Sequence, residues 1–129
     1  MKSLDLVKTF YKKIGDGDLP GLFETLDDSI SWELVGPETI PYFGTYKGHT
    51  EVQHFFEKLF SAETIIEFMP EEFIDGDQII CVTGREKCLA KNTNKTFESR
   101  WVHIFSCQNG KIIRWREYID TAPLVEAYR

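Results

Sequence analysis

The sequence predicts a single α+β domain in which N-terminal helices pack on one face of a curved antiparallel sheet. Three observations support this fold class. The chain has 129 residues, which is the usual length of one domain, and residues 1–129 show no linker, repeat or low-complexity segment. Helical periodicity dominates the first half, and strand-like alternation with hairpin turn signals dominates the second half. Helices that are grouped before antiparallel strands favour the α+β class.

Two helices are predicted at the start of the chain. Apolar residues recur at helical spacing from Leu4 to Ile14, and Ser3 is positioned to cap this helix. The glycines that follow are expected to end it. A second, short helix is predicted after Asp18, with Leu22 among its buried residues.

A strand, an irregular segment and a third helix follow. Residues 29–35 alternate between polar and apolar side chains, which predicts a strand. Residues 36–48 contain two prolines and three glycines, and we expect a loop or a short edge strand that lies over a pocket mouth. Thr50 and Gln53 have the spacing of a capping box, which predicts the start of a helix that buries Phe55 and its apolar neighbours.

The sequence from about residue 64 to residue 120 predicts four long strands. Turn-forming residues occur at 75–76, 92–94 and 109–110, where Asp-Gly, Asn-Thr-Asn and Asn-Gly favour hairpins. A proline soon after the last strand predicts a short closing helix at 124–128. The second half is therefore expected to form an antiparallel meander.

Composition excludes several classes of function. The formal net charge is −6 and the basic residues are scattered, so the chain lacks the basic stripe of a nucleic-acid-binding protein. No apolar stretch reaches the roughly 18 residues that span a membrane, and the N-terminus has no secretory signal pattern. Three cysteines without a CxxC spacing indicate free thiols, and we expect a cytoplasmic protein. Glu51 and His54 form a lone Glu-x-x-His pair, so we predict no metal and no other cofactor.

Strand parity identifies candidate site residues. Alternate side chains of a strand point to opposite faces of the sheet. In three successive predicted strands, the otherwise apolar face carries one ionisable residue: Glu86, His103 and Glu117. Two carboxyl groups on one enclosed wall would share protons, and at least one pKa should rise towards neutrality. This is the condition for general acid/base catalysis near neutral pH.

Each of these residues also has a structural interpretation. Glu86 and Glu117 can reach the rim of the sheet or pair with arginines across a dimer interface, and His103 can be a hydrogen-bonded core histidine. The residues that we expect to line a ligand pocket beside them are Trp32, Tyr42, Trp101, Ser99, Cys88 and Ile119. Their aromatic members can equally belong to the core.

Two segments resemble a known family. Residues 101–121 read WVHIFSCQNGKIIRWREYIDT and are similar to the closing hairpin of SnoaL-like, ketosteroid-isomerase-related proteins of the nuclear transport factor 2-like superfamily. Residues 44–48, GTYKG, fit the same pattern. The resemblance covers nearly the whole chain in element order. It implies a cone-shaped, cystatin-like α+β barrel with helices on its concave face, a small-molecule pocket, and a homodimer formed through the outer face of the sheet.

The second half is also similar to limonene epoxide hydrolase, which activates water with two aspartates bridged by an arginine. Glu117 and Glu86 fall on the two aspartates, and they are the same residues that strand parity selects. The position of the arginine holds Gly84, so the pattern departs from that enzyme at a residue its chemistry needs.

Compared with ketosteroid isomerase, the proton-abstracting carboxylate falls at Glu33. The tyrosine and the protonated acid of its oxyanion hole fall near Phe10 and Val102, whose side chains cannot donate a hydrogen bond. Steroid isomerisation is therefore not implied by the resemblance.

We predict a small-molecule-binding protein that acts as an acid/base enzyme of the isomerase, hydrolase or cyclase type on a small, largely apolar ligand. Glu117 and Glu86 are its candidate acid/base groups, with His103 as an auxiliary donor and Glu33 as a further candidate. The alternative is a non-catalytic ligand-binding or dimerisation module of the same fold, which the missing arginine and oxyanion donors support.

Overall fold

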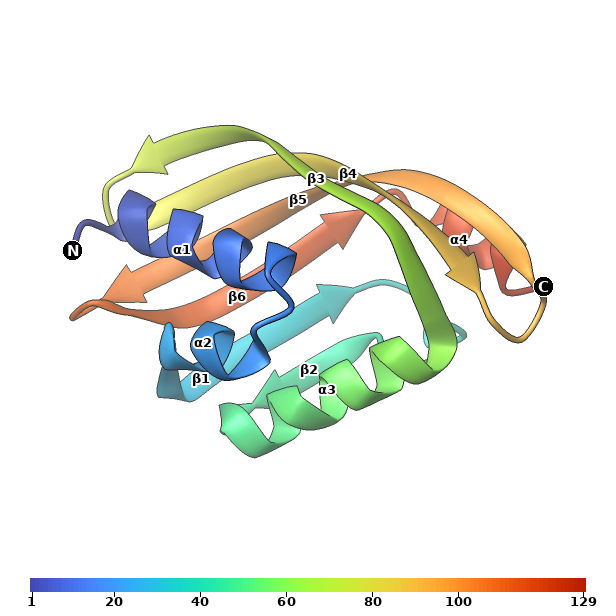
Figure 1. Cartoon of the computed structure of the whole chain (residues 1–129), viewed down its shortest axis with the longest axis horizontal. Helices are drawn as coiled ribbons and strands as arrows, with labels where there is room; N and C mark the ends of the chain where they lie inside the picture. Colours follow the sequence, from blue (N-terminus) through green and yellow to red (C-terminus); the bar gives the residue numbers. More distant parts are fainter.

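One curved sheet of six strands organises the fold, and the computed structural model describes it together with all other parts of residues 1–129 (Figure 1). The strands are β1 (Leu26–Val35), β2 (Gly44–Lys47), β3 (Glu63–Gly76), β4 (Ile79–Ala90), β5 (Lys95–Gln108) and β6 (Lys111–Ile119). Their order in the sheet is β2-β1-β6-β5-β4-β3, and only the β1–β6 pair is parallel. The α+β class and the four-strand meander are confirmed. The sheet is open, because β2 and β3 remain as its two edges, so the predicted barrel is not closed.

Three helices pack on one face of this sheet, and a fourth lies near the C-terminal end (Figure 1). They are α1 (Ser3–Gly15), α2 (Leu19–Glu24), α3 (Gly48–Ala62) and α4 (Ala122–Ala127). The two termini lie at opposite ends of the long axis of the molecule. None of these helices has the length and hydropathy that crossing a bilayer requires.

The helix starts test the predicted caps. Asp18 caps α2 as expected, since its Oδ1 accepts a hydrogen bond from the backbone N–H of Gly21 at 2.9 Å. The predicted Thr50–Gln53 capping box is wrong, because α3 begins at Gly48. Instead, Glu51 Oε1 accepts from the backbone N–H of Lys47 at 2.8 Å, one turn earlier in the chain.

The three predicted hairpins are present, and left-handed backbone conformations sit at each turn. Asn94 has φ 62°, and Asn109 and Gly110 have φ 53° and 75°, which suits a two-residue hairpin loop. In the first hairpin the turn falls later than predicted. There β3 continues through Gly76, and Asp77 takes the positive φ of 70°.

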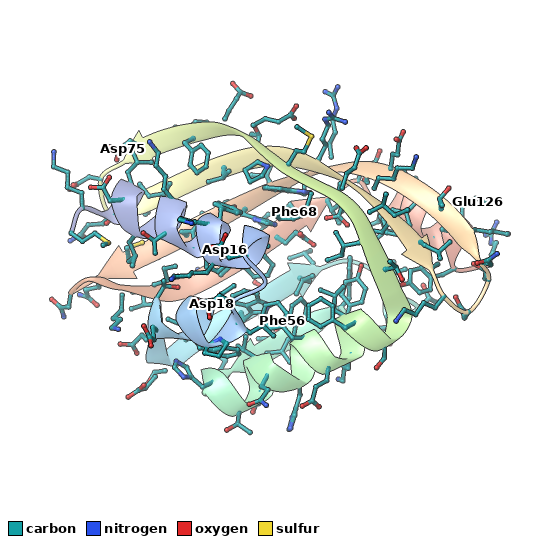
Figure 2. All side chains as sticks on the ribbon, viewed as in Figure 1. Asp16, Asp18, Phe56, Phe68, Asp75 and Glu126 are labelled. Carbon is teal, nitrogen blue, oxygen red and sulfur yellow. The ribbon has the colours of Figure 1, made fainter.

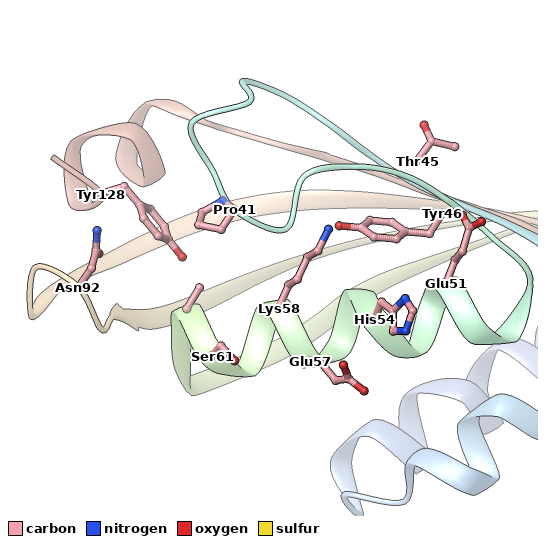
Figure 3. Close-up of a pocket in the computed structure, with 11 residues that line it drawn as sticks. Pro41, Thr45, Tyr46, Glu51, His54, Glu57, Lys58, Ser61, Asn92 and Tyr128 are labelled. Atoms are coloured by element: carbon pink, nitrogen blue, oxygen red, sulfur yellow. The ribbon is translucent and has the colours of Figure 1, made fainter.

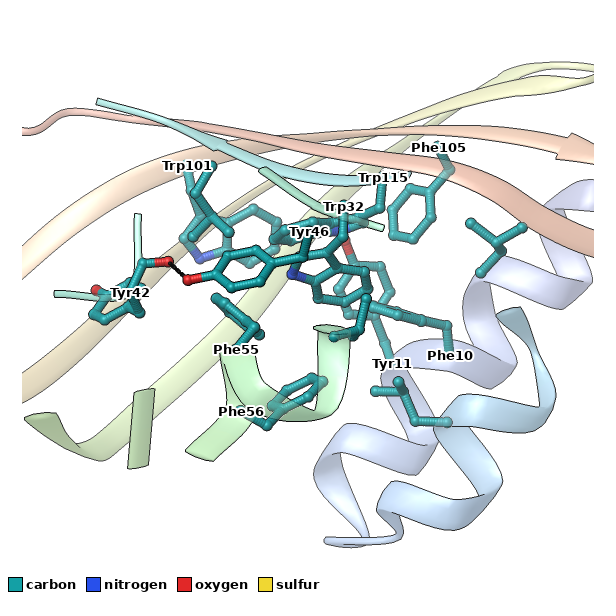
Figure 4. Close-up of a cluster of buried hydrophobic side chains, with 14 of the residues drawn as sticks. Phe10, Tyr11, Trp32, Tyr42, Tyr46, Phe55, Phe56, Trp101, Phe105 and Trp115 are labelled. Carbon is teal, nitrogen blue, oxygen red and sulfur yellow. Dashed lines mark hydrogen bonds between the residues drawn. The ribbon is translucent and has the colours of Figure 1, made fainter. Parts of the chain in front are cut away.

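Aromatic side chains fill the space between the helices and the concave face of the sheet (Figure 4). Trp32 and Trp115 are neighbours across the parallel β1–β6 pair, and their rings stack at a centroid distance of 3.9 Å. The hydroxyl of Tyr46 donates to the carbonyl oxygen of Tyr42 at 2.9 Å and ties the segment before β2 to the core. Figure 2 shows Phe68 of β3 among the side chains that occupy this interior.

Strand parity is confirmed for β4 and β5, whose inward residues are those the alternation predicts. In β6 a bulge opposite Ser106 and Cys107 shifts the register. As a result Ile112 is fully buried, whereas Ile113, which was expected on the inner face, is only partly buried. Glu117 lies beyond the bulge and points inward as predicted.

Candidate functional site

Among the hollows of the molecule, one is lined by a group of buried and partly buried carboxyl groups and a histidine. A groove of about 790 Å³ runs along the outside of α3, and its lining consists largely of exposed polar side chains (Figure 3). A cavity of about 410 Å³, here called the inner cavity, lies between α1, α3 and the concave face of the sheet. Of its 22 lining residues 14 are hydrophobic, which suits an apolar ligand, and the remainder include three glutamates and a histidine.

A hydrogen-bonded chain of three side chains crosses the wall of the inner cavity. The hydroxyl oxygen of Tyr11, on α1, lies 2.7 Å from Nδ1 of His103. Nε2 of His103, on β5, lies 2.8 Å from Oε1 of Glu117. His103 and Glu117 are direct partners in the β5–β6 register, so the sheet itself sets this contact. His103 and Glu117 are only 2% and 7% exposed, which makes the chain an internal one.

His103 is held by the aromatic rings around it. The ring of Trp101 stacks on it at a centroid distance of 3.9 Å, and the ring of Trp115 lies 4.7 Å away. Trp101 occupies this place because β4 carries Gly84 opposite it, where an added Cβ would lie 2.3 Å from the indole. Burial among these rings holds the pKa of His103 well below its usual value, so the imidazole is neutral at physiological pH.

A second set of acidic groups lies beside this chain. Glu63, at the junction of α3 and β3, is only 2% exposed, and its Oε2 accepts hydrogen bonds from the hydroxyls of Tyr42 at 2.5 Å and Tyr128 at 2.6 Å. Its other oxygen, Oε1, is buried and has no hydrogen-bond partner. The thiol of Cys88 donates to Oε2 of Glu86 at 3.4 Å.

The same group of side chains offers potential metal-ligating atoms. One atom each from Glu63, Glu86 and Cys88 lies within 4.8 Å of the others. Burial and the neighbouring glutamates raise the pKa of the Cys88 thiol, so it stays protonated and donates a hydrogen bond. In this structure the three residues form a hydrogen-bonded acidic cluster.

Burial controls the protonation of the three glutamates. It raises the pKa of Glu117 to about 8, with a smaller contribution from the negative charge of Glu63. It raises the pKa of Glu86 well above its usual value, with contributions from the charges of Glu117 and Glu63. It also raises the pKa of Glu63, against the opposing effect of the tyrosine hydroxyl donors. The inner cavity thus holds one carboxyl group, Glu117, that titrates near neutral pH, beside two others whose pKa values burial also raises.

The protonation state of Glu117 determines which way the chain of hydrogen bonds runs. When Glu117 is protonated, its O–H donates to Nε2 of His103, and the Nδ1–H of the same ring donates to the Tyr11 oxygen. The Tyr11 hydroxyl hydrogen is then free for another acceptor. When Glu117 is ionised, it accepts from Nε2–H, and Tyr11 donates to Nδ1. The chain can therefore carry a proton between Glu117 and Tyr11.

The structure brings together most of the residues that strand parity selects. Glu117, Glu86 and His103 all line the inner cavity, and so do the predicted ligand contacts Trp32 and Tyr42. The buried Glu117 and His103 and the partly buried Glu86 therefore line one enclosed space, as the alternation along the strands predicted.

Glu33 is not part of this arrangement. Its side chain lies on the outer face of the sheet, where its Oε1 is 3.9 Å from Nη2 of Arg114. The apolar residues Trp32 and Leu34, its neighbours in β1, point inward instead. Because alternate residues of a strand face opposite ways, Glu33 cannot reach the cavity, and its inclusion in the site is corrected.

Four predicted ligand contacts lie outside the lining of the inner cavity. Trp101 and Cys88 are buried behind His103 and Glu86, which they contact directly. Ser99 donates its hydroxyl to the carbonyl oxygen of Asp120 at 2.6 Å. Ile119 pairs with Trp101 across the sheet and is only partly buried.

The opening of the cavity also differs from the prediction. In the segment 36–48, Tyr42 alone lines the cavity, and it is almost fully buried. The exposed lining residues are Gly15, which ends α1, and Gly17, which follows it, together with Phe60 and Ile65 around the end of α3. The cavity thus opens between the α1–α2 turn and the α3–β3 junction.

Sequence reasoning missed two residues of the site. The isomerase comparison placed hydrogen-bond donors near Phe10 and Val102, which lack them, but Tyr11 and His103 lie one residue further along and carry the polar atoms. Glu63 follows a helix directly and gives no periodic signal. A tyrosine within the apolar stripe of a predicted helix was the one available sign for Tyr11, because a buried phenol needs a hydrogen-bond partner.

Comparisons with known proteins agree with this architecture. An NTF2-like protein from Burkholderia xenovorans LB400 is 32% identical, with a TM-score of 0.87, and the match covers 98% of this chain and 95% of that chain. An NTF2-like protein from Burkholderia thailandensis E264 is 21% identical, with a TM-score of 0.93 over 100% and 98% of the two chains. TerC, co-crystallised with polyporic acid, is 20% identical, with a TM-score of 0.87 over 97% and 96%. The last two matches, at this identity, establish the fold alone.

No curated protein matches the chain. The family model described as the SnoaL-like domain matches residues 7–115, which include most of α1 and most of the sheet. This range contains Tyr11, Glu63, Glu86 and His103, and ends two residues before Glu117. The chain therefore belongs to the SnoaL-like domain family.

Proposed function

We propose that the protein is an acid/base enzyme that moves protons on a small, largely apolar ligand held in the inner cavity. The observation that carries this proposal is the hydrogen-bonded chain Tyr11–His103–Glu117 in the wall of an enclosed cavity that Glu86 also lines. An isomerase, a hydrolase and a cyclase all need such proton transfers. This fits the SnoaL-like domain family to which the chain belongs.

The carboxyl groups of Glu86 and Glu117 take the roles of base and acid. Burial and the charge of Glu117 raise the pKa of Glu86, and burial raises that of Glu117, so the pair shares protons and one carboxyl group can serve as the acid while the other serves as the base. A carboxylate at Glu86 removes a proton from the ligand. Tyr11 donates its hydroxyl proton to a ligand oxygen, His103 passes its Nδ1 proton to Tyr11, and Glu117 passes its proton to Nε2 of His103. The net transfer is one proton from the ligand to Glu86 and one from Glu117 to the ligand.

A generic carbon acid tests this proposal without knowledge of the natural ligand. In 5-nitrobenzisoxazole a base removes the ring C–H proton, the N–O bond breaks, and a coloured nitrophenolate forms. We expect the purified protein to accelerate this reaction, and we expect both Glu117→Gln and Glu86→Gln to lower the rate by about tenfold or more. The wild-type rate should rise with pH as Glu86 ionises, and it should fall again as Glu117 loses its proton near its pKa of about 8.

The control for this experiment is Glu33→Gln, which removes a carboxyl group from the outer face of the sheet and should leave the rate unchanged. Wild-type rates in both cavity variants would contradict the proposal. In that case the alternative, a ligand-binding module without chemistry, gains support from Gly84, which stands where the similar epoxide hydrolase has its arginine.

A further inference from the structure

We infer that the inner cavity selects a ligand that carries a protonated amine on an apolar, ring-bearing body. The inference rests on the proposed function only through the use of the same cavity, and it adds the charge of the ligand. Its basis is the polarity of the cavity, one unpartnered buried oxygen and the apolar walls around them.

The acidic groups of the cavity have no basic counterpart. Glu63, Glu86 and Glu117 all line it, and the only lysine or arginine in the lining is Lys13. The ammonium of Lys13 lies at the partly exposed end of α1, 3.3 Å from Oδ2 of Asp18, so that charge is already paired. An anionic ligand would meet three carboxyl groups and no free cation. A cationic ligand would gain in a cavity where water screens charges poorly.

Glu63 presents an acceptor that the protein leaves unused. Its Oε2 accepts two tyrosine hydroxyls, from Tyr42 and Tyr128, which fix the orientation of the carboxyl group. Its Oε1 is buried without a partner, although the residue is only 2% exposed. Buried polar atoms are nearly always hydrogen-bonded, and the Cys88 thiol, which adjoins Glu63, already donates to Glu86, so this oxygen is open to a donor from a ligand. An ammonium group supplies three donors and no acceptor, which matches a site made of carboxyl oxygens.

The rest of the ligand must be apolar. Five aromatic side chains line the cavity together with the acidic groups: Phe10, Trp32, Phe55, Phe56 and Trp115 (Figure 4). The volume of about 410 Å³ accommodates a body of one or two rings. The complementary ligand therefore has one charged end and one ring-bearing end.

Binding of such a cation should release protons. An ammonium beside Glu117 and Glu86 favours their ionised forms and so lowers pKa values that burial had raised. The other titratable groups that face the three glutamates are Tyr11 from α1, Tyr42 from the segment before β2, Cys88 from β4, His103 from β5 and Tyr128 from α4. Burial keeps each of these five uncharged near neutral pH, so the glutamates are the source of the protons. Amine affinity should consequently increase as the pH rises from about 6 to about 8.

Three probes of matched shape test the inference by isothermal titration calorimetry: phenethylamine, phenethyl alcohol and hydrocinnamate. They share a phenyl ring on a short chain and differ in carrying a positive, a neutral and a negative end. We expect phenethylamine to bind at least about tenfold more tightly than the alcohol, and hydrocinnamate to bind most weakly. Titrations in two buffers of different ionisation enthalpy should show proton release for the amine alone.

Substitutions test which carboxyl group is responsible for the preference for the amine. Glu63→Gln should weaken phenethylamine by about tenfold and leave phenethyl alcohol within about twofold, and Glu33→Gln on the outer face should change neither. If Glu63→Gln fails to fold, Glu86→Gln provides the same comparison. Equal affinities for the three probes, tighter binding of the alcohol or the anion, or no measurable amine binding would each overturn the inference. None of these measurements requires turnover, so their failure is separable from failure of the benzisoxazole reaction.

Discussion

Glu117 is the side chain whose protonation should be most visible in the stability of the protein. Its pKa of about 8 in the folded state lies far above the unfolded value of about 4.3. Between these two values the folded protein binds a proton that the unfolded chain has lost. The stabilising effect is therefore complete below about pH 4.3 and disappears as the pH rises through about 8.

The contribution of His103 to the stability of the protein has the opposite pH dependence, and it changes at lower pH. Its pKa is held well below the ordinary value of about 6.5, so its contribution is present above that value and is lost only as the pH falls. From about pH 6.5 to about pH 8 the raised pKa of Glu117 determines how the stability changes with pH. Stability should fall with rising pH in this window.

We predict that Glu117→Gln reduces this dependence. Glutamine keeps the shape of the protonated acid and can still donate to Nε2 of His103, but it has no proton to lose. The free energy of unfolding of the wild type should decrease by up to about 1.4 kcal/mol per pH unit for each carboxyl group involved. The pH dependence of the unfolding free energy should be weaker in the variant by the contribution of Glu117. Urea unfolding at about pH 6.5 and about pH 8 measures the difference, and parallel slopes for the two proteins would rule out the assigned pKa.

At the scale of the strand, Gly84 keeps the histidine in place. An added Cβ at this position would lie 2.3 Å from the ring of Trp101 and 2.6 Å from the carbonyl oxygen of Met69. The backbone oxygen cannot move aside easily, and the indole can move only by disturbing the ring of His103, on which it stacks. Gly84, which stands where the similar hydrolase has its arginine, thus leaves the space that the ring of Trp101 occupies.

We predict that Gly84→Ala destabilises the protein by about 1–3 kcal/mol and alters the environment of Trp101 and His103. The matched control is Gly15→Ala at the end of α1, where an added Cβ meets nothing within 4 Å and the change should stay within about 0.5 kcal/mol. Thermal unfolding gives the stability, and near-ultraviolet circular dichroism reports the tryptophan packing. If the two substitutions changed the stability equally, the contact between a Cβ at position 84 and Trp101 would not be destabilising, and the prediction would be wrong.

The elements also show what the sequence can predict and what it cannot. Long strands have a period of two, so Glu86, His103 and Glu117 could be assigned to one face from alternation alone. The bulge in β6 could not be predicted, because it depends on pairing with β5. Glu33 was placed wrongly by a family comparison that strand parity already opposed, and the structure agrees with parity.

The missed site residues lie where local pattern carries no information. Glu63 enters the cavity because α3 ends against β3 at that residue, and Tyr42 and Tyr128, which bind it, are 21 and 65 positions away in the sequence. Tyr11 reaches His103 across 92 positions. Contacts of this kind follow from how helices dock on the sheet, which depends on the packing of the whole domain.

At the scale of the whole molecule, the outer face of the sheet remains to be accounted for. Val35 and Tyr118 are each 41% exposed, and they are direct neighbours across the β1–β6 pair, with Val102 beside Tyr118 on β5. Glu33 and Arg114 lie on the same face. A row of apolar side chains among charged ones on an uncovered sheet is typical of an interaction surface. The homodimer predicted from the resemblance would use this face, and it stays a prediction.

We predict that Tyr118→Arg dissociates this dimer. In an interface with two-fold symmetry one substitution acts twice, so two arginines would face each other or their neighbours across the axis and repel. The wild type should elute at twice the chain mass of 15.0 kDa in size-exclusion chromatography with light scattering, and the variant at the single mass. Gln53→Arg, on the exposed side of α3, is the matched control and should remain dimeric. Because the inner cavity opens on the opposite side of the sheet, monomeric Tyr118→Arg should still bind the amine probe. A wild-type protein at the single mass would show instead that the curved sheet is stable with this face in water.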